Sequence, residues 1–128
     1  MVTDGSKSPQ VLVIDDEQGV VETVRAALED GGFRALTALG ATEGLALYER
    51  HWREIDLVLL DYLMPEMNGD LVFETMRAID PEVRVLLLTA CDDRVAHKMF
   101  AAGLRGFIQK PFSMDDLIRQ VGEEIDKP

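Results

Sequence analysis

The sequence predicts an α/β fold with a doubly wound, five-stranded parallel sheet in the order 2-1-3-4-5 and five helices. Short apolar runs alternate with segments of helical periodicity from residue 11 onward. Three of these runs are almost continuous in Val, Ile and Leu, as in strands that helices cover on both faces. Five successive strand–helix units joined by right-handed crossovers leave few other topologies.

The five apolar runs are the expected strands. The first, third and fourth are strongly aliphatic, the second is weaker, and the fifth is short. They cover residues 11–14, 33–38, 55–60, 83–88 and 106–109.

Helical patterns follow each run. The first helix has apolar residues at helical spacing over residues 20–28, and it ends at Gly31 and Gly32, because glycine favours the turn that closes a helix. The second covers residues 41–52 and the third covers residues 68–79. The fourth and fifth follow the fourth and fifth runs.

Capping residues mark three of these helices. Asn68 is the expected N-cap of the third helix, and Asp92 or Asp93 caps the fourth. The fifth opens with Ser113 and Asp116 in an arrangement like a capping box.

Length and composition indicate one domain. The chain has 128 residues, and we expect a flexible tail over residues 1–9 and the domain over residues 10–126. No apolar run approaches the roughly 18 residues of a membrane helix, and the polar first residues are unlike a secretory signal. A single cysteine builds no internal disulfide, so the cytoplasm is the expected compartment.

The chain is strongly acidic, with a formal net charge of −11 at pH 7. Nucleic-acid phosphates and anionic lipids repel such a surface, so we expect no direct binding to nucleic acid and none to membranes. Metal cations and basic protein surfaces are better partners. Acidity also serves solubility, so charge alone does not select a function.

Acidic residues stand where the first and third strands end. Asp15, Asp16 and Glu17 follow the first run, and Asp61 follows the third. These two strands flank the switch point of the sheet, where open α/β folds bind ligands. Carboxylates a few ångströms apart repel by roughly 4 kcal/mol at an effective dielectric of about 20, so they must be protonated, spread apart or neutralised by a cation. Oxygen ligands of this kind favour Mg²⁺, Mn²⁺ or Ca²⁺.

A hydroxyl and a cation are expected at the same edge of the sheet. Thr89 ends the fourth run and Lys110 follows the fifth. Taken alone, Thr89 is an ordinary β-branched strand residue and Lys110 an ordinary surface lysine. Beside a carboxylate cluster, they are the groups that a phosphate-handling site uses.

Taken in order, these residues resemble the receiver domain of two-component response regulators, which has a flavodoxin-like fold. The resemblance covers residues 11–125. Any one of its four segments is a weak signal, but all four in order, each at the end of its expected strand, are specific. They are Asp15-Asp16-Glu17, Asp61-Tyr-Leu-Met-Pro65 with Met67-Asn68-Gly69, Thr89-Ala90, and Lys110-Pro111-Phe112.

The resemblance implies a role for each residue of the site. Asp61 would accept a phosphoryl group from a kinase phosphohistidine and become an acyl phosphate. Asp16, Asp61 and the backbone carbonyl of Leu63 would bind Mg²⁺, with Asp15 acting through a bound water. Mg²⁺ and the Lys110 ammonium would stabilise charge on the transferring group.

The resemblance also implies a conformational switch. Phosphorylation would draw the Thr89 hydroxyl inward and let Phe107 rotate toward the core, which changes the face made by the fourth helix, fifth strand and fifth helix. The implied partners are a histidine kinase or phosphotransfer protein and a downstream protein on that face, and a phosphorylation-linked homodimer is compatible with it. Many receivers have Tyr at the position of Phe107, so an apolar output contact is expected here. The bond between Lys110 and Pro111 is expected to be cis.

Two departures from the family pattern concern hydrolysis of the acyl phosphate. Leu63 and Cys91 stand two positions after Asp61 and Thr89, where they flank the path of the attacking water. Neither side chain positions water well. We therefore expect a long-lived acyl phosphate and no enzyme activity beyond self-phosphorylation from a donor and slow autodephosphorylation.

Two other functions are compatible with the same residues. A phosphatase of the haloacid-dehalogenase type also uses Asp and Mg²⁺, but it needs a second acid where Leu63 stands. A pseudo-receiver would be an interaction module that signals without phosphorylation. The sequence is also compatible with a stand-alone receiver and with a piece of a larger regulator or hybrid kinase.

Overall fold

The structure is a computed structural model that describes residues 8–90 and 93–128. Its five strands each overlap one of the apolar runs. All strand pairs are parallel, and the order across the sheet is β2-β1-β3-β4-β5, so the predicted fold class and strand order are confirmed. The strands are β1 (Gln10–Asp15), β2 (Arg34–Leu39), β3 (Leu57–Asp61), β4 (Val85–Thr89) and β5 (Gly106–Gln109).

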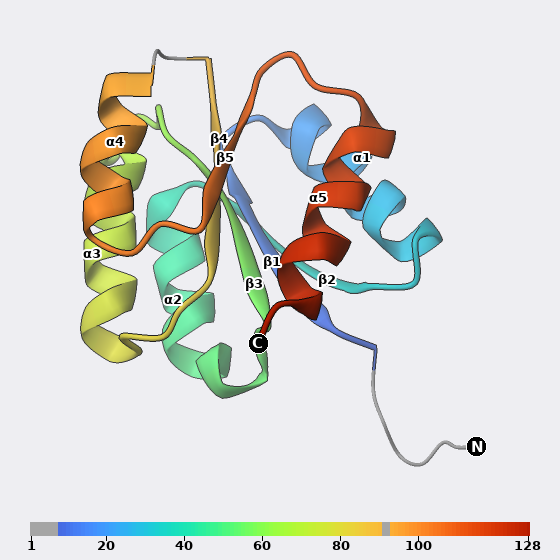
Figure 1. Cartoon of the computed structure of the whole chain (residues 1–128), viewed down its shortest axis with the longest axis horizontal. Helices are drawn as coiled ribbons and strands as arrows, with labels where there is room; N and C mark the ends of the chain where they lie inside the picture. The colour runs from blue at the N-terminus through green and yellow to red at the C-terminus, as the bar shows by residue number, and fades with distance from the viewer. Residues whose placement is uncertain (1–7, 91–92) are drawn as a thin grey trace.

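Helices cover both faces of the sheet. They are α1 (Gln18–Asp30), α2 (Ala41–His51), α3 (Gly69–Ile79), α4 (Asp93–Ala101) and α5 (Met114–Asp126), and a 3-10 turn, η1 (Trp52–Glu54), follows α2. Figure 1 shows α1 and α5 on one face and α2, α3 and α4 on the other. In the described part of the chain, no helix combines the length and the apolar character that crossing a membrane requires.

The core lies in two layers because strand side chains alternate between the faces. On β1, Val11 and Val13 pack toward α1 and α5, whereas Leu12 and Ile14 pack toward α2, α3 and α4. Strands β3 and β4 follow the same alternation, and their apolar residues are buried. Burial on both faces explains why these runs read as continuous aliphatic sequence.

Some predicted boundaries differ from the structure. The second helix ends at His51, because Trp52 begins the 3-10 turn, which closes with a 3.2 Å hydrogen bond from the Ile55 amide to the Trp52 carbonyl. Ile55 and Asp56, expected in the third strand, therefore precede β3. A turn likewise places Val83 before β4, since its amide donates to the Asp80 carbonyl at 3.1 Å.

The predicted caps have mixed outcomes. Ser113 caps α5, because its side-chain oxygen accepts the Asp116 amide at 3.0 Å, as expected. Asn68 occupies the N-cap position of α3, but its side chain makes no capping hydrogen bond. Helix α4 begins at Asp93, and Asp92 lies outside the described residues.

The predicted tail over residues 1–9 remains a prediction, since residues 1–7 lie outside the described part of the chain. The Arg34 side chain donates to the Ser8 carbonyl at 2.8 Å, and the Arg34 amide donates to the Pro9 carbonyl at 2.9 Å.

Candidate functional site

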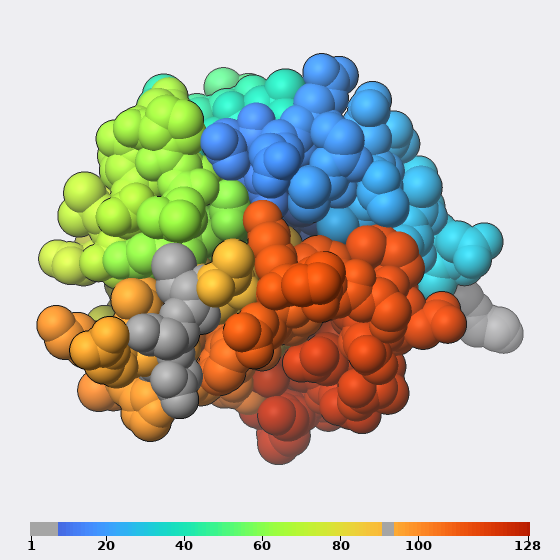
Figure 2. Space-filling model, turned by 90° about the horizontal axis from the view of Figure 1, so that it is seen from above, coloured from blue at the N-terminus to red at the C-terminus, as the bar shows by residue number. Residues whose placement is uncertain are grey.

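The carboxyl ends of the strands meet at one face of the molecule. Figure 2 looks onto this face and shows the segments after β1 (blue), β3 (green) and β5 (orange) gathered around its centre. A cavity of about 270 Å³ opens there. Its lining residues are Asp16, Glu17, Asp61, Leu63, Thr89, Ala90 and Lys110.

Asp15 is the fully buried carboxylate of the site. It ends β1 and has no exposed surface. One of its oxygens accepts the Glu17 amide at 2.9 Å, and the other accepts the Lys110 ammonium at 3.2 Å. Both oxygens are thus held by donors, which fixes the orientation of the side chain.

Asp61 ends β3 beside Asp15, and only 5% of the residue is exposed. Its Oδ1 accepts a hydrogen bond from Lys110 Nζ at 3.2 Å. Burial, followed by the negative charge of Asp15, raises the pKa of Asp61 to about 6, although Lys110 opposes this rise. The carboxylate therefore carries its charge at a free-energy cost, which a cation at this position would reduce.

Three aspartates form a group that suits a hard metal ion. Asp15, Asp16 and Asp61 each offer a carboxylate oxygen, and these oxygens lie within 4.8 Å of one another. Among the described residues, no other set of three metal-ligating side chains gathers in this way. One lysine does not balance three carboxylates, so the donor set fits Mg²⁺. Leu63, whose carbonyl was the fourth predicted ligand, lines the same cavity.

Lys110 joins the two carboxylates from the end of β5. Its backbone amide donates to the Thr89 carbonyl at 2.8 Å, and its bond to Pro111 is cis, as predicted. Burial alone would lower the pKa of Lys110, but the charges of Asp15 and Asp61 outweigh it and raise the pKa. The side chain is therefore a charged ammonium at neutral pH.

The two predicted switch residues lie on neighbouring strands. Thr89 ends β4, is 2% exposed and lines the cavity. Phe107 is half-buried on β5, paired with Leu87, and packs against the core on the α2–α4 face. Its ring meets the Phe100 ring of α4 edge to face, with centroids 6.2 Å apart and an interplanar angle of 68°. Cys91 lies outside the described residues.

Gly69 lets the chain turn tightly after β3. Its amide donates to the Tyr62 carbonyl at 2.6 Å. A Cβ at this position would lie 2.7 Å from the Asp61 carbonyl oxygen. Only glycine fits there without moving the backbone of Asp61, which gives a physical reason for glycine in the Met67-Asn68-Gly69 segment.

Two residues that line the cavity belong to segments noted in the sequence but had no role assigned to them. Glu17 and Ala90 both line it. Their signal was positional, since each follows closely on a strand that carries a site residue. A residue that directly follows a strand is therefore a candidate for lining the site even when its side chain has no obvious chemical role.

A wider apolar groove lies next to the acidic cavity. Its volume is about 760 Å³, and it runs between the start of α1 and the segment that joins β5 to α5. It shares Glu17, Ala90 and Lys110 with the acidic cavity. Its other lining residues are Gly19, Val20, Thr23, Pro111, Phe112 and Met114.

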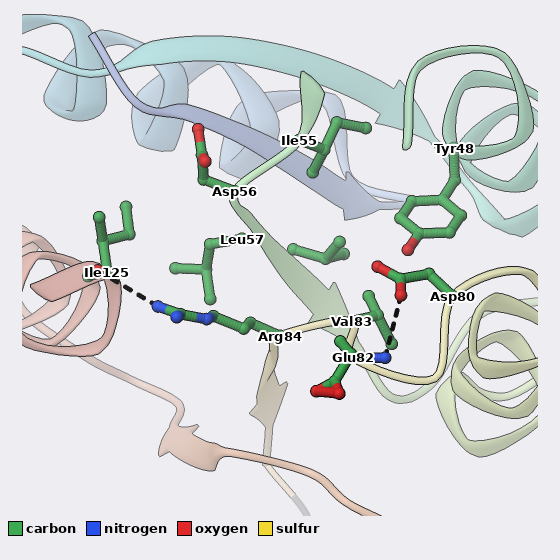
Figure 3. Close-up of a pocket in the computed structure, with 10 residues that line it drawn as sticks. Tyr48, Ile55, Asp56, Leu57, Asp80, Glu82, Val83, Arg84 and Ile125 are labelled. Atoms are coloured by element: carbon green, nitrogen blue, oxygen red, sulfur yellow. Dashed lines mark hydrogen bonds between the residues drawn. The ribbon is translucent and has the colours of Figure 1, made fainter. Parts of the chain in front are cut away.

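A third cavity, of about 250 Å³, lies at the opposite edge of the sheet, near the amino ends of β3 and β4 (Figure 3). Arg84 crosses it and donates to the carbonyls of Glu124 and Ile125 at 2.9 and 3.2 Å, where α5 ends. The Tyr48 hydroxyl faces Asp80 on the other side (Figure 3). The contacts of Arg84 join the end of α5 to the start of β4, so we interpret this cavity as structural.

Comparisons with known proteins agree with this geometry. The family model of the response regulator receiver domain matches residues 11–122. The sensor kinase CckA of Brucella abortus is 32% identical over 126 residues, which cover 98% of this chain and 13% of the relative. The transcriptional regulatory protein PrrA of Mycobacterium tuberculosis is 36% identical over 120 residues, which cover 91% of this chain and 50% of the relative. The chain thus spans half or less of the length of these relatives.

A solved structure is also similar. The CheX-CheY-BeF3-Mg+2 complex from Borrelia burgdorferi superimposes with a TM-score of 0.89 at 26% sequence identity, covering 94% of this chain and 92% of that one. The fold, the family model and the relatives all point to the same family. The chain therefore belongs to the receiver domains of two-component response regulators, a family of signalling switches.

Proposed function

We propose that the chain is a phosphoacceptor switch in which Asp61 takes a phosphoryl group from a phosphohistidine. The observation that carries this proposal is the surroundings of the Asp61 carboxylate. Oxygens of Asp15 and Asp16 lie within 4.8 Å of it, and Lys110 Nζ lies 3.2 Å away. Since the pKa of Asp61 is about 6, the carboxylate is mostly ionised at pH 7 and available as a nucleophile.

The transfer follows from these positions. A carboxylate oxygen of Asp61 attacks the phosphorus, the bond from phosphorus to the donor imidazole breaks, and the imidazole nitrogen keeps the electron pair and takes a proton from water. The Lys110 ammonium contacts a phosphoryl oxygen as the negatively charged phosphoryl group moves onto Asp61. Asp15 holds Lys110 in place through their 3.2 Å contact.

Asp16, Asp61 and the Leu63 carbonyl are the proposed Mg²⁺ ligands, with Asp15 acting through a water. When bound, Mg²⁺ would neutralise the carboxylates and draw the phosphoryl oxygens toward Asp61. The three grouped carboxylates support this assignment, and so does the similarity to a complex whose name includes Mg²⁺ and the BeF3 group.

We place the donor protein in the apolar groove beside the cavity. Val20, Phe112 and Met114 supply an apolar lining, and Lys110 belongs to both the groove and the acidic cavity. A histidine kinase or phosphotransfer protein seated in the groove would bring its phosphohistidine within reach of Asp61.

The proposed output is a change on the face made by α4, β5 and α5. Thr89 stands between the cavity and the core, and Phe107 lies one strand away. A phosphoryl group that draws the Thr89 hydroxyl toward it would leave space for the Phe107 ring to turn inward. Phe100, 41% exposed, would then lose its aromatic partner, which changes the apolar surface that a downstream protein meets.

Intact mass spectrometry tests the phosphoacceptor proposal. The protein is incubated with Mg²⁺ and either acetyl phosphate or a phosphorylated histidine phosphotransfer protein, next to Asp61→Ala and a sample with EDTA. A single phosphoryl gain that disappears in the variant and in EDTA supports the proposal. If neither donor phosphorylates the wild type, the proposal fails and a module that signals without phosphate replaces it.

A further inference from the structure

The loop between β3 and α3 (residues 62–68) carries the proposed Mg²⁺ ligand Leu63, and the structure shows how this loop is held. At its first residue, the Tyr62 amide donates to the Leu88 carbonyl of β4 at 3.0 Å. Met64 is 6% exposed and lies in the core, whereas Leu63 is 56% exposed. Leu63 is therefore held in place by its neighbours in the loop and not by burial of its own side chain.

Glu66 makes a contact that crosses from this loop to helix α2. Its Oε1 accepts a 3.2 Å hydrogen bond from the amide of Thr42. This amide is one of the first in α2. The N-cap of α2 is Gly40, which has no side chain to perform this task. A carboxylate at the positive end of a helix is favourable, and hydrogen bonds from the Thr42 side chain and then from its amide lower the pKa of Glu66.

Gly40 leaves the space that Glu66 uses. A Cβ on Gly40 would lie 2.7 Å from Glu66 Oε1, and its φ of +110° is one that other residues rarely adopt. The loop after β2 and the loop after β3 therefore fit each other at this point. Glu66 thus performs from a distant part of the sequence the capping that the N-cap residue normally performs.

We infer that Glu66 is a positioning residue for the metal site, which caps α2 and thereby holds the loop that presents the Leu63 carbonyl. Pro65 strengthens the link, because its ring restricts its own φ and the conformation of Met64. The peptide group of Leu63 is thus joined to one anchor in the core and another on α2. This inference rests on the proposed function, since it concerns the Mg²⁺ site described there.

Three variants test the role of Glu66. Glu66→Ala removes the hydrogen bond and the charge, Glu66→Gln keeps an acceptor oxygen without the charge, and Glu74→Ala removes another exposed carboxylate, on α3. Without metal, hydrogen exchange should become faster at the Thr42 amide in Glu66→Ala only. Mg²⁺ titration by calorimetry at pH 7.5 should give a dissociation constant about three- to tenfold higher for Glu66→Ala, in line with the loss of a cap or of a ligand-orienting contact. For Glu66→Gln and Glu74→Ala, the change should stay within about twofold.

The outcomes distinguish a failure of this inference from a failure of the proposed phosphoacceptor function. If wild type binds Mg²⁺ and Glu66→Ala binds it equally well, the inference is wrong and the proposed function is untouched. If Glu66→Gln loses as much affinity as Glu66→Ala, charge alone explains the effect and the positioning role is also wrong. If wild type shows neither Mg²⁺ binding nor a phosphoryl gain, the proposed function fails and the inference fails with it.

Discussion

Asp61→Asn should stabilise the metal-free protein at neutral pH, although it removes the proposed phosphoacceptor. The buried carboxylate has its pKa raised from 3.8 to about 6. Each pKa unit corresponds to about 1.4 kcal/mol, so ionised Asp61 costs the fold at most about 3 kcal/mol. Asparagine avoids this cost and keeps an oxygen for Lys110, whose attraction is already included in the pKa of about 6. We expect a net gain of about 1–2 kcal/mol, or about 4 °C in Tm per kcal/mol.

The pH dependence of this gain has a definite sign. The folded pKa of Asp61 lies above the unfolded value of 3.8, so the folded state binds the proton more tightly. The group therefore favours folding below about pH 4, and this contribution is lost as the pH rises toward about 6. The asparagine side chain of the variant does not titrate. The difference between variant and wild type should be small at pH 4, grow up to pH 6 and stay level above it.

Urea unfolding in EDTA at pH 4, 5, 6 and 7.5 measures this difference. Asp115→Asn is the control, because it removes an exposed carboxylate and should change stability by about 0.5 kcal/mol or less. Added Mg²⁺ should then stabilise wild type by about 2.7 kcal/mol at a hundredfold excess over its dissociation constant, and should stabilise Asp61→Asn less. An Asp61→Asn protein no more stable than wild type at pH 7.5, or one with the same gain at pH 4, would refute the electrostatic reasoning.

The site, the switch and the loop after β3 each give a further prediction. Leu63→Asn should speed loss of the phosphoryl group, followed by intact mass over time, because an amide positions water better than leucine; an unchanged rate contradicts this. A double-mutant cycle on the free energy of unfolding should give a coupling of about 0.5–1 kcal/mol between the rings of Phe100 and Phe107. In the phosphorylated protein this coupling energy should be smaller. Equal coupling in both states would exclude the proposed ring movement. Gly69→Ala should lower the free energy of unfolding, measured in urea, by about 1–3 kcal/mol, because its Cβ would lie 2.7 Å from a backbone carbonyl oxygen. The control, Gly19→Ala, has nothing within 4 Å of its Cβ and should leave stability unchanged or raise it.

Local sequence patterns determined the strands and the chemistry at their ends. Apolar runs located all five strands, most clearly the central strands β1, β3 and β4, because strands buried on both faces must be aliphatic whatever their neighbours are. Strand order and the switch-point rule then placed Asp15 and Asp61 at one edge, with Thr89 and Lys110 beside them. The errors were local, at Ile55 and other element ends, where turn hydrogen bonds rather than hydrophobicity set the boundary.

Tertiary structure alone decided which side chains are partners. Asp15 and Lys110 stand 95 positions apart, and their 3.2 Å contact depends on how β1 and β5 are placed in the finished sheet. Glu66 caps α2, whereas Asn68, which has the expected cap chemistry, caps no amide with its side chain. The pKa of Asp61 depends on burial among distant residues. Composition and periodicity describe residues that are neighbours in the sequence. These contacts join residues that are far apart in the sequence and become neighbours only when the sheet has formed.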